Sequence, residues 1–420
     1  MLAQAIYSIG IYFYGLGIRI GSPFNAKARR WVNGRKRIFD RIQLAINEAR
    51  KTHGDRKIAW FHCASLGEFE QGRPVIEAFR QQHPDYFIFL TFFSPSGYEV
   101  RNAYTGADFI YYLPLDTPSR AAKFVRTVNP DVAFFIKYEF WFNYLENLRI
   151  NQVPVFLLSA NFRTTQVFFK WYGDWPRKLL AGFATIFVQN ENSRELLEFI
   201  NIRNVIISGD TRFDRVSAIA GNAREFPLIR AFASGNKIII AGSSWPADES
   251  LLIQYLSENH DVKIILAPHQ TDEAHISAIL ARCNGLAVKL SAANPSSVTM
   301  YRVLVIDTIG ILPHLYQYGT VAYIGGGFGA GIHNILEAAT FGLPVFFGPN
   351  YHKFNEASDL VLLNGAFPIE NYQSLKDKMA PLLSQPARLS EASAVCRKYV
   401  ASKKGATEIV MSNIRQFIEL

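Results

Sequence analysis

The sequence contains few residues that could cross-link the chain or hold a metal ion. Its three cysteines, Cys63, Cys283 and Cys396, lie far apart and form no CxxC or zinc spacing. We therefore expect reduced structural thiols in a cytoplasmic compartment. None of the nine histidines belongs to an HExxH motif, and no two aspartates are two positions apart. We expect neither a metal ion nor a cofactor.

Charges are missing from the first eighteen residues, MLAQAIYSIGIYFYGLGI, and a basic cluster follows them. The order is wrong for a cleavable signal peptide, which has its positive charges first. Eighteen residues is at the lower limit for crossing a bilayer, where roughly 20 are typical. We expect a membrane anchor, either spanning or lying in the plane, with its basic flank on the cytoplasmic side near anionic headgroups. A helix buried against the protein body is the alternative.

The remaining composition indicates a globular protein with an anionic partner. The 420 residues are 49% hydrophobic and 14% aromatic, enough for two packed cores. The net charge of +9 is compatible with nucleic acid, an acidic membrane surface or a phosphorylated substrate. The basic cluster beside the apolar segment favours a membrane surface over nucleic acid.

Short apolar runs alternate with helix-period segments along both halves of the chain, which predicts an α/β protein with parallel sheets covered on both faces. Thirteen such runs are expected as strands, from 57–63 to 343–350. Two doubly wound Rossmann-like domains would face a central cleft, with ligands at the carboxyl ends of their strands. The expected parts are an anchor (1–22), an N-terminal domain (23–215), a linker (216–236), a C-terminal domain (237–400) and a C-terminal helix (401–420) that could pack back on the N-terminal domain.

A glycine-rich turn, IGGGFGAGIHN, follows one of the predicted strands of the second domain. Backbone N–H groups freed by glycine at a helix start can bind an anion. We expect a helix beginning near His333 and Asn334, which could donate to a phosphate, with Glu337 positioned for ribose hydroxyls. A dinucleotide fingerprint would instead lie in the first turn of its domain, with its acid about 20 residues later. No P-loop motif occurs, so the turn fits a sugar nucleotide, with tight packing as the alternative.

Three more segments of the second half follow predicted strands and should reach the same edge of the sheet. The turn DTIGILPHLY offers Asp307, Thr308 and Gly310 near a nucleobase. Ser243 and His269 follow two other strands. Each of these also fits an ordinary connection between a strand and a helix.

Two glutamates of the first half are candidates for acid–base chemistry. Glu68, in HCASLGEFE, should stand at a helix start after a tight turn at Gly67, where a carboxylate is stabilised in its ionised form. It could act as a general base or only as a cap. Glu139, in KYEFWFN, follows an apolar strand and needs either a partner, such as Lys137, or a function.

Four blocks together resemble the 3-deoxy-D-manno-octulosonic acid (Kdo) transferases of lipopolysaccharide assembly, which have the GT-B fold. The blocks are ASLGEFEQGRPVI (64–76), IKYEFWFNYL (136–145), DTIGILPHLY (307–316) and GGGFGAGIHNILEAATFGLPVFFGPN (325–350). The resemblance covers essentially the whole chain. It implies a membrane-associated transferase at the cytoplasmic face of the inner membrane, with CMP-Kdo as donor and the 6′-hydroxyl of a lipid A precursor as acceptor.

The resemblance also implies roles for residues. Glu68 would be the general base, and Glu139 would match a second important glutamate. The positions implied for CMP are Ser243, His269, Asp307, Thr308, Gly310, Gly329, Gly331, His333, Asn334 and Glu337. Many family members read Pro-Arg-His where this chain has Ala267-Pro268-His269, so the phosphate-facing arginine is absent here.

Other functions remain compatible with the sequence. One is a GT-B transferase that uses a UDP-sugar, which competition by CMP or by UDP would distinguish. Another is a membrane-anchored binding protein of the same fold without activity, which product formation would exclude. A dehydrogenase is disfavoured by the position of the glycine turn.

Overall fold

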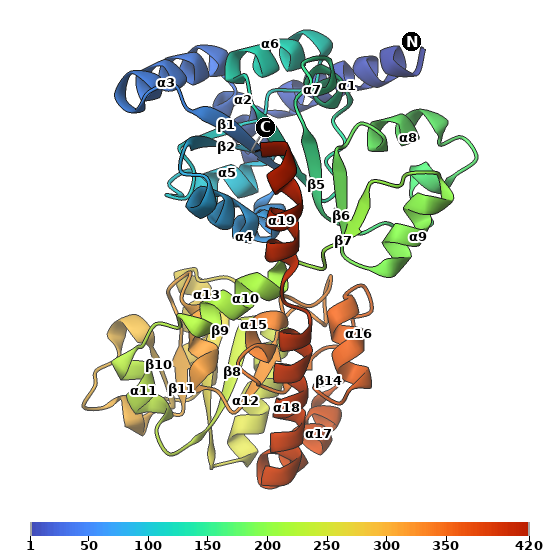
Figure 1. The fold of residues 1–420 in the computed structure, drawn as a ribbon. Helices are drawn as coiled ribbons and strands as arrows, with labels where there is room; N and C mark the ends of the chain where they lie inside the picture. The colour runs from blue at the N-terminus through green and yellow to red at the C-terminus, as the bar shows by residue number, and fades with distance from the viewer. Residues whose placement is uncertain (1, 419–420) are drawn as a thin grey trace. The chain divides into compact units, whose positions relative to one another are not determined.

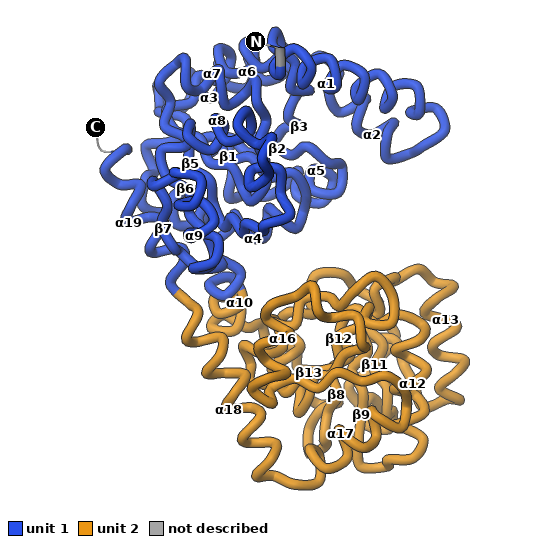
Figure 2. The backbone as a smooth tube through the Cα atoms, turned by 90° about the vertical axis from the view of Figure 1, so that its right-hand side faces the viewer, with its two compact units in different colours: residues 1–215, 405–420 blue, residues 216–404 orange. Residues whose placement is uncertain are grey.

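The computed structural model describes residues 2–418, which form two α/β units (Figures 1 and 2). Residues up to 215, together with those from 405 onward, make unit 1, and residues 216–404 make unit 2. Each unit contains one seven-stranded sheet in which all neighbouring strands are parallel. The segment expected as a linker, 216–236, lies within unit 2 and is largely helical.

The sheet of unit 1 has the order β3-β2-β1-β4-β5-β6-β7. Its strands are β1 (Lys57–Cys63), β2 (Tyr86–Phe92), β3 (Phe109–Tyr112), β4 (Val132–Ile136), β5 (Val155–Ala160), β6 (Thr185–Val188) and β7 (Val205–Ile207). Its helices are α1 (Leu2–Gly21), α2 (Ala26–Gly34), α3 (Ile38–His53), α4 (Leu66–Gln82), α5 (Pro95–Arg101), α6 (Pro118–Val128), α7 (Phe142–Ile150), η1 (Val167–Phe169), α8 (Asp174–Leu180), α9 (Glu191–Phe199) and α19 (Ala406–Ile418). Helix α10 (Arg212–Gly221) leads from unit 1 into unit 2.

The sheet of unit 2 has the order β10-β11-β9-β8-β12-β13-β14. Its strands are β8 (Lys237–Ser244), β9 (Val262–Pro268), β10 (Ala287–Lys289), β11 (Val303–Val305), β12 (Val321–Ile324), β13 (Val345–Phe347) and β14 (Ala366–Pro368). Its helices are α11 (Pro227–Ala233), α12 (Pro246–Glu258), α13 (Glu273–Arg282), η2 (Leu290–Ala292), η3 (Val298–Met300), α14 (Leu312–Leu315), η4 (Tyr316–Tyr318), α15 (Leu336–Ala339), α16 (Asn355–Leu362), α17 (Tyr372–Ser384) and α18 (Pro386–Ser402).

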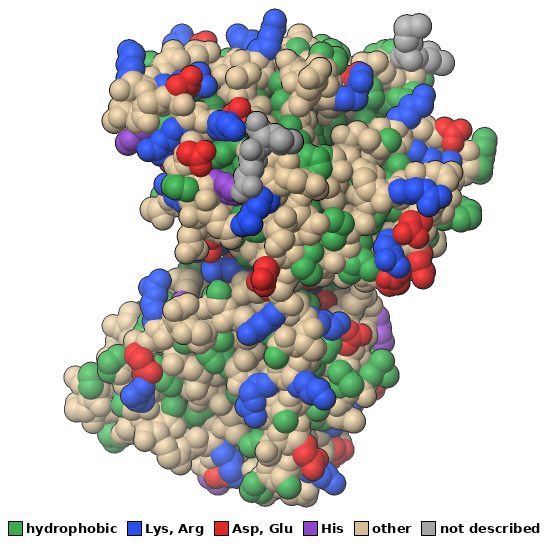
Figure 3. Space-filling view, in the orientation of Figure 1, with side chains coloured by type: hydrophobic (Ala, Val, Ile, Leu, Met, Phe, Trp, Pro, Cys, Tyr) green, Lys and Arg blue, Asp and Glu red, His purple; other side chains and the backbone are tan. Residues whose placement is uncertain are grey.

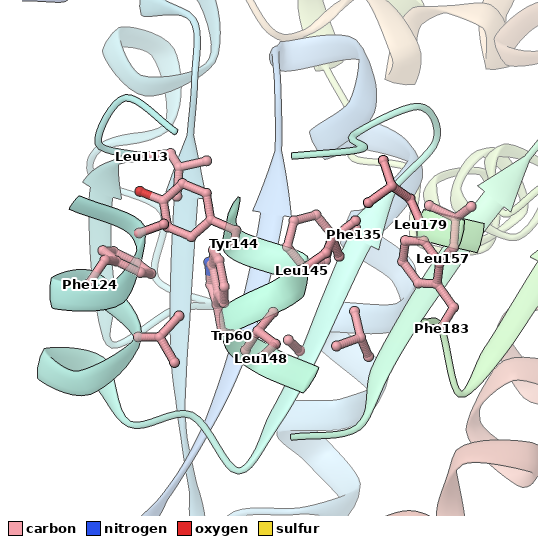
Figure 4. Packing of buried hydrophobic residues seen from close by; sticks show 14 of the residues in the cluster. Trp60, Leu113, Phe124, Phe135, Tyr144, Leu145, Leu148, Leu157, Leu179 and Phe183 are labelled. Atoms are coloured by element: carbon pink, nitrogen blue, oxygen red, sulfur yellow. The ribbon is translucent and has the colours of Figure 1, made fainter. Parts of the chain in front are cut away.

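Aromatic side chains fill the core on one face of the unit 1 sheet (Figure 4). The ring of Trp60 on β1 lies 4.9 Å from that of Phe124, 5.2 Å from that of Phe135 and 5.6 Å from that of Tyr144. All four side chains are fully buried. Because both faces of the central strands are covered, these strands read in the sequence as continuous apolar runs.

The opposite face of this sheet is covered partly by the end of the chain. Helix α19 packs against α4 and contributes Val410 and Ile414 to a buried cluster with Phe61 and Phe134 of the sheet. Asp214 fixes the start of α19, since its carboxylate accepts hydrogen bonds from the backbone N–H of Gly405 and both the N–H and the hydroxyl of Thr407, each at 2.7 Å. The chain thus returns to unit 1 after completing unit 2.

The N-terminal helix α1 docks on unit 1 through one face only. The hydroxyl of Tyr7 donates to the carboxylate of Asp116 at 2.7 Å, and a Cβ on Gly15 would lie 2.4 Å from a methyl group of Leu115. The opposite face leaves apolar side chains in solvent, including Ile6 and Phe13. Within residues 2–418 no helix is long and apolar enough to span a membrane.

Candidate functional site

The candidate donor residues of unit 2 gather where its sheet changes direction. Strand β8 lies between β9 and β12, and the chain winds from β8 outward through β9 before returning to β12. In doubly wound sheets, ligands bind outside the carboxyl ends of the strands at this switch point. The segments after β8, β9 and β12 all end there.

Three aromatic side chains from these three segments stack on one another at the switch point. The rings of Trp245 and His269 are 4.6 Å apart with 23° between their planes, and those of His269 and His333 are 4.6 Å apart with 25°. The indole N–H of Trp245 also donates to Nε2 of His333 at 3.3 Å, so the proton of a neutral His333 resides on Nδ1. Burial, and then the neighbouring His269, lower the pKa of His333.

The first three glycines of the turn have a packing role. A Cβ on Gly325 would lie 2.2 Å from the carbonyl oxygen of Ser243, and one on Gly327 would lie 2.5 Å from the backbone nitrogen of Gly348. Gly326 has φ of +92°, a conformation that residues with a side chain rarely adopt. Gly329 is different, because it is exposed and a Cβ there would come no closer than 3.6 Å to other atoms.

Asp248, near the start of α12, holds the turn in place. Its buried carboxylate accepts hydrogen bonds from the N–H of Gly326 at 3.1 Å, the N–H of Trp245 at 2.9 Å and the hydroxyl of Tyr323 at 2.8 Å. Burial raises the pKa of Asp248, while these three donors lower it. Asp248 therefore links the loop after β8 to the loop after β12.

The helix expected from His333 onward is much shorter than predicted. Only α15, four residues long, is helical in this segment, and residues 331–335 are irregular. Asn334 accepts from the N–H of Leu336 and donates to the carboxylate of Glu337, both at 3.1 Å. A single turn adds little helix dipole, so an anion here depends on individual N–H groups and side chains.

The remaining donor candidates lie near the same edge of the sheet. Asp307 follows β11, and its carboxylate accepts from the backbone N–H of Ser291 at 3.1 Å and from the Ser291 hydroxyl. Thr308 and Gly310 are exposed, and Gly310 has φ of +92°. Ser243 has a left-handed φ of +52° at the end of β8. Such strain in a non-glycine residue is commonest at functional sites.

In unit 1 the two candidate glutamates lie at the corresponding switch point, where β1 adjoins β4. Glu68 stands in the first turn of α4, and the hydroxyl of Ser65 donates to its carboxylate. The tight turn expected at Gly67 is not present, since Gly67 belongs to this helical turn and has no left-handed φ. A Cβ on Gly67 would make only an ordinary contact, 3.8 Å from Oγ of Ser65.

Glu139 is held by two aromatic partners. Its carboxylate accepts from the indole N–H of Trp141 at 2.6 Å and lies 3.1 Å from Nε2 of His62. His62 is fully buried, and its Nδ1 lies 2.9 Å from the hydroxyl of Thr91, which accepts from the indole of Trp60 at 2.8 Å. The tautomer that completes this chain has the Thr91 hydroxyl donating to Nδ1 and Nε2–H donating to Glu139.

Glu68 and Glu139 both act on Cys63, the last residue of β1. Burial raises the pKa of the Cys63 thiol, and the nearby carboxylates of Glu68 and Glu139 raise it further. The thiol is therefore uncharged at neutral pH. The two glutamates are brought to one edge of the sheet although 70 residues separate them in sequence.

The sequence reasoning missed four residues that position these sites, namely His62, Trp141, Trp245 and Asp248. Each lies at the end of a strand or just after one, which was the available signal. Within residues 2–418, no group of three or more His, Cys, Asp or Glu side chains is arranged to hold a metal ion.

The fold defines an α/β protein of the GT-B-like class. A UDP-GlcNAc 2-epimerase from Neisseria meningitidis, bound to UDP-GlcNAc, superposes with a TM-score of 0.61 at 16% identity, covering 86% of this chain and 100% of that one. MurG from Acinetobacter baumannii superposes with a TM-score of 0.55 at 14% identity, covering 86% of this chain and 100% of that one. At these identities the likeness concerns the fold alone.

Sequence comparison supports the resemblance stated from the motifs. Residues 36–215 match the model of the 3-deoxy-D-manno-octulosonic-acid transferase (kdotransferase) family. The transferase of Aquifex aeolicus is 28% identical over 335 residues, covering 77% of this chain and 86% of that protein. The transferase of Bordetella pertussis is 25% identical over 376 residues, covering 86% of this chain and 87% of that protein. These matches confirm the resemblance to Kdo transferases and indicate a glycosyltransferase of lipopolysaccharide biosynthesis.

Proposed function

We propose that the protein transfers Kdo from CMP-Kdo to the 6′-hydroxyl of a lipid A precursor. The observation that carries the proposal is that one chain, similar to Kdo transferases, has two glutamates at the switch point of unit 1 and an aromatic and glycine-rich site at that of unit 2. The two glutamates of unit 1 suit activation of a hydroxyl group, and the site of unit 2 suits a nucleoside monophosphate. CMP is the leaving group, so it belongs with unit 2.

In the proposed reaction the acceptor oxygen forms a bond to the anomeric carbon of Kdo, and the bond from that carbon to the phosphate oxygen of CMP breaks. Glu68 takes the proton of the hydroxyl, a role worth typically ~10²–10⁴-fold in rate. CMP leaves with the bonding electrons. The rings of His269 and His333 would stabilise its phosphate, and Glu337 would accept from the ribose hydroxyls.

A single displacement inverts the anomeric configuration, and no residue is required to form a covalent intermediate. The absence of an Asp-x-Asp pair in the sequence supports a reaction that runs without a metal ion. Glu139 is proposed to bind the acceptor next to Glu68. The indole N–H of Trp141 and the imidazole of His62 hold its carboxylate in place.

The proposed location is the cytoplasmic face of the inner membrane, with α1 lying in the plane of the bilayer surface. The exposed side of α1 carries apolar and aromatic side chains such as Ile9, Phe13 and Ile20. Arg29 and Arg30 of the following helix are exposed and would meet anionic headgroups. In Figure 3 apolar side chains reach the surface in the region of α1.

Substitution of the proposed base tests the function directly. Glu68→Ala should abolish Kdo transfer from CMP-Kdo while CMP affinity, measured by calorimetry, stays unchanged. Glu77→Ala, on the same helix and in an exposed pair with Arg73, is the matched control and should keep full activity. Loss of CMP binding together with activity in Glu68→Ala would show a structural role. Competition by UDP in place of CMP would show a different donor.

A further inference from the structure

A pocket opens in unit 1 beside the segment that carries Glu139. It has a volume of about 350 Å³ and is lined by Tyr7 of α1, Tyr138, Phe140, Val167 of η1, and Trp175 and Leu179 of α8. The lining is almost entirely aromatic or aliphatic. The proposed proton transfer does not use it.

The polar atoms of the lining tyrosines already have partners. The hydroxyl of Tyr7 donates to Asp116, and that of Tyr138 donates to the carbonyl oxygen of Asn161. Gln166 is the one polar side chain in the lining besides the tyrosines, and its Oε1 accepts from the backbone N–H of Arg163. The rest of the pocket presents ring and aliphatic surfaces, which suits a hydrocarbon ligand.

Ring contacts fix the walls of the pocket. Tyr7 lies 5.9 Å from Trp175, centroid to centroid, and Phe140 lies 4.9 Å from Phe168. Because three walls belong to elements packed against the sheet, the pocket is formed before any ligand arrives, which lowers the entropy cost of binding.

The pocket lies next to the proposed acceptor site. Tyr138 and Phe140 line it, and they are the two chain neighbours of Glu139, whose carboxylate is turned instead toward His62 and Trp141. A ligand that occupies the pocket and also reaches Glu139 must therefore have an apolar part directly attached to a polar part, because the residues that line the pocket are adjacent to Glu139 in the chain.

The surroundings of the pocket indicate an amphipathic, anionic ligand. Ile6 on α1 is 61% exposed, and Trp171 on the loop before α8 is 90% exposed, so apolar surface continues outside the pocket. Arg163, Lys170 and Lys178 lie on the same stretch of chain, and none of them forms an ion pair with another residue among 2–418. This combination suits a phosphorylated glycolipid.

We propose that this pocket binds one acyl chain of the glycolipid acceptor and so presents the acceptor sugar to Glu68 and Glu139. The inference rests on the proposed function, because it names the part of the acceptor that unit 1 recognises. It assigns the pocket to the acceptor itself and not to a bulk membrane lipid.

The test compares a phosphorylated glucosamine disaccharide with its acyl chains and the same disaccharide after deacylation. Val167→Trp fills the pocket from an exposed position, and Val100→Trp, on α5 and also exposed, is the matched control. Val167→Trp should raise KM for the acylated acceptor about tenfold, equivalent to roughly two methylene groups left in water. KM for the deacylated acceptor should not change, and Val100→Trp should alter neither.

Equal effects of Val167→Trp on the two acceptors, or no effect on either, would overturn the proposal. The proposal would also be overturned if Val167→Trp lost binding to anionic phospholipid vesicles while the ratio of KM for the two acceptors stayed the same. A bulk membrane lipid would then occupy the pocket. If the Val167→Trp variant does not fold, the same measurements are made with Val167→Phe. If the wild type transfers Kdo to neither acceptor, the proposed function fails, and calorimetric binding of the two disaccharides still decides the role of the pocket.

Discussion

At the scale of single residues, both candidate sites depend on aromatic donors that fix a catalytic or binding group. Trp141 and His62 orient the carboxylate of Glu139, and Trp245 orients the ring of His333. A carboxylate that accepts charge-assisted hydrogen bonds is held more firmly than one in solvent. Removing one donor should therefore weaken function more than it weakens the fold.

Trp141→Phe removes the 2.6 Å hydrogen bond to Glu139 and preserves most of the ring packing. We expect kcat to fall roughly tenfold or more, as loss of a hydrogen bond to a charged group implies. Steady-state kinetics with saturating CMP-Kdo measures it. Trp31→Phe is the control, because the buried Nε1 of Trp31 has no hydrogen-bond partner in the described part of the chain. Equal losses in the two variants would contradict the assigned role of Trp141.

The lowered pKa of His333 makes stability depend on pH. The unfolded chain binds a proton at this residue near 6.5, whereas the folded protein resists protonation until a lower pH. The unfolded state therefore binds more protons as pH falls below about 6.5, and the free energy of unfolding decreases. His333→Gln should flatten this decrease in urea titrations between pH 7 and 5. His260→Gln, an exposed histidine of the same unit, should leave the slope unchanged.

At the scale of elements, the glycines of the turn differ in their surroundings, since some pack closely against other strands and Gly329 is exposed. Sequence reasoning could not separate them, because all five glycines look alike and the close approaches to Ser243 and Gly348 come from other strands. The convergence of Trp245, His269 and His333 could not be predicted for the same reason, since no single segment of the sequence determines the order of the strands in the sheet.

Two substitutions in the turn should behave oppositely. Gly325→Ala forces a Cβ against the backbone of Ser243 and Ser244 and should destabilise unit 2 by about 3 kcal/mol or more. Gly329→Ala meets no close atom and should change stability by less than about 0.5 kcal/mol. If Gly329 approaches the donor phosphate, its alanine variant should still bind CMP-Kdo more weakly in calorimetry. Unchanged affinity would remove Gly329 from the site.

Strand prediction was accurate where the strands are long and buried on both faces. Strand β1 matches its predicted range, and twelve further strands lie within or close to theirs. Strand β14 was missed. It is as short as β7, β10, β11 and β13, which were predicted, but unlike them it ends in a proline, Pro368. The helix after the glycine turn was overestimated, since ILEAA favours helix, whereas the side chain of Asn334 accepts from the N–H of Leu336 and the helix begins only at Leu336.

At the scale of the whole molecule, Asp214 connects two parts of unit 1 that are far apart in the sequence. It receives three hydrogen bonds from residues 191 and 193 positions away, where the chain re-enters unit 1. The apolar patterns of α4 and α19 predicted helices, but nothing in the sequence paired one with the other.

Asp214→Ala should leave two backbone N–H groups of the α19 start without their acceptor and destabilise unit 1 by about 2–4 kcal/mol. Hydrogen exchange of α19 amides should accelerate, while unit 2 amides stay protected. Asp261→Ala removes only an exposed ion pair with Lys237 and should cost less than about 1 kcal/mol. Uniform loss of protection across both units would contradict this local role.

The return of α19 also affects the order in which the protein is made. Unit 2 is one continuous stretch, so it can fold as soon as residue 404 has left the ribosome. Unit 1 emerges first but is completed only after unit 2, because the helix that packs against α4 follows unit 2 in the chain. Until α19 has been made, part of an apolar face of the first sheet stays uncovered, and chaperones that bind such surfaces would find it there.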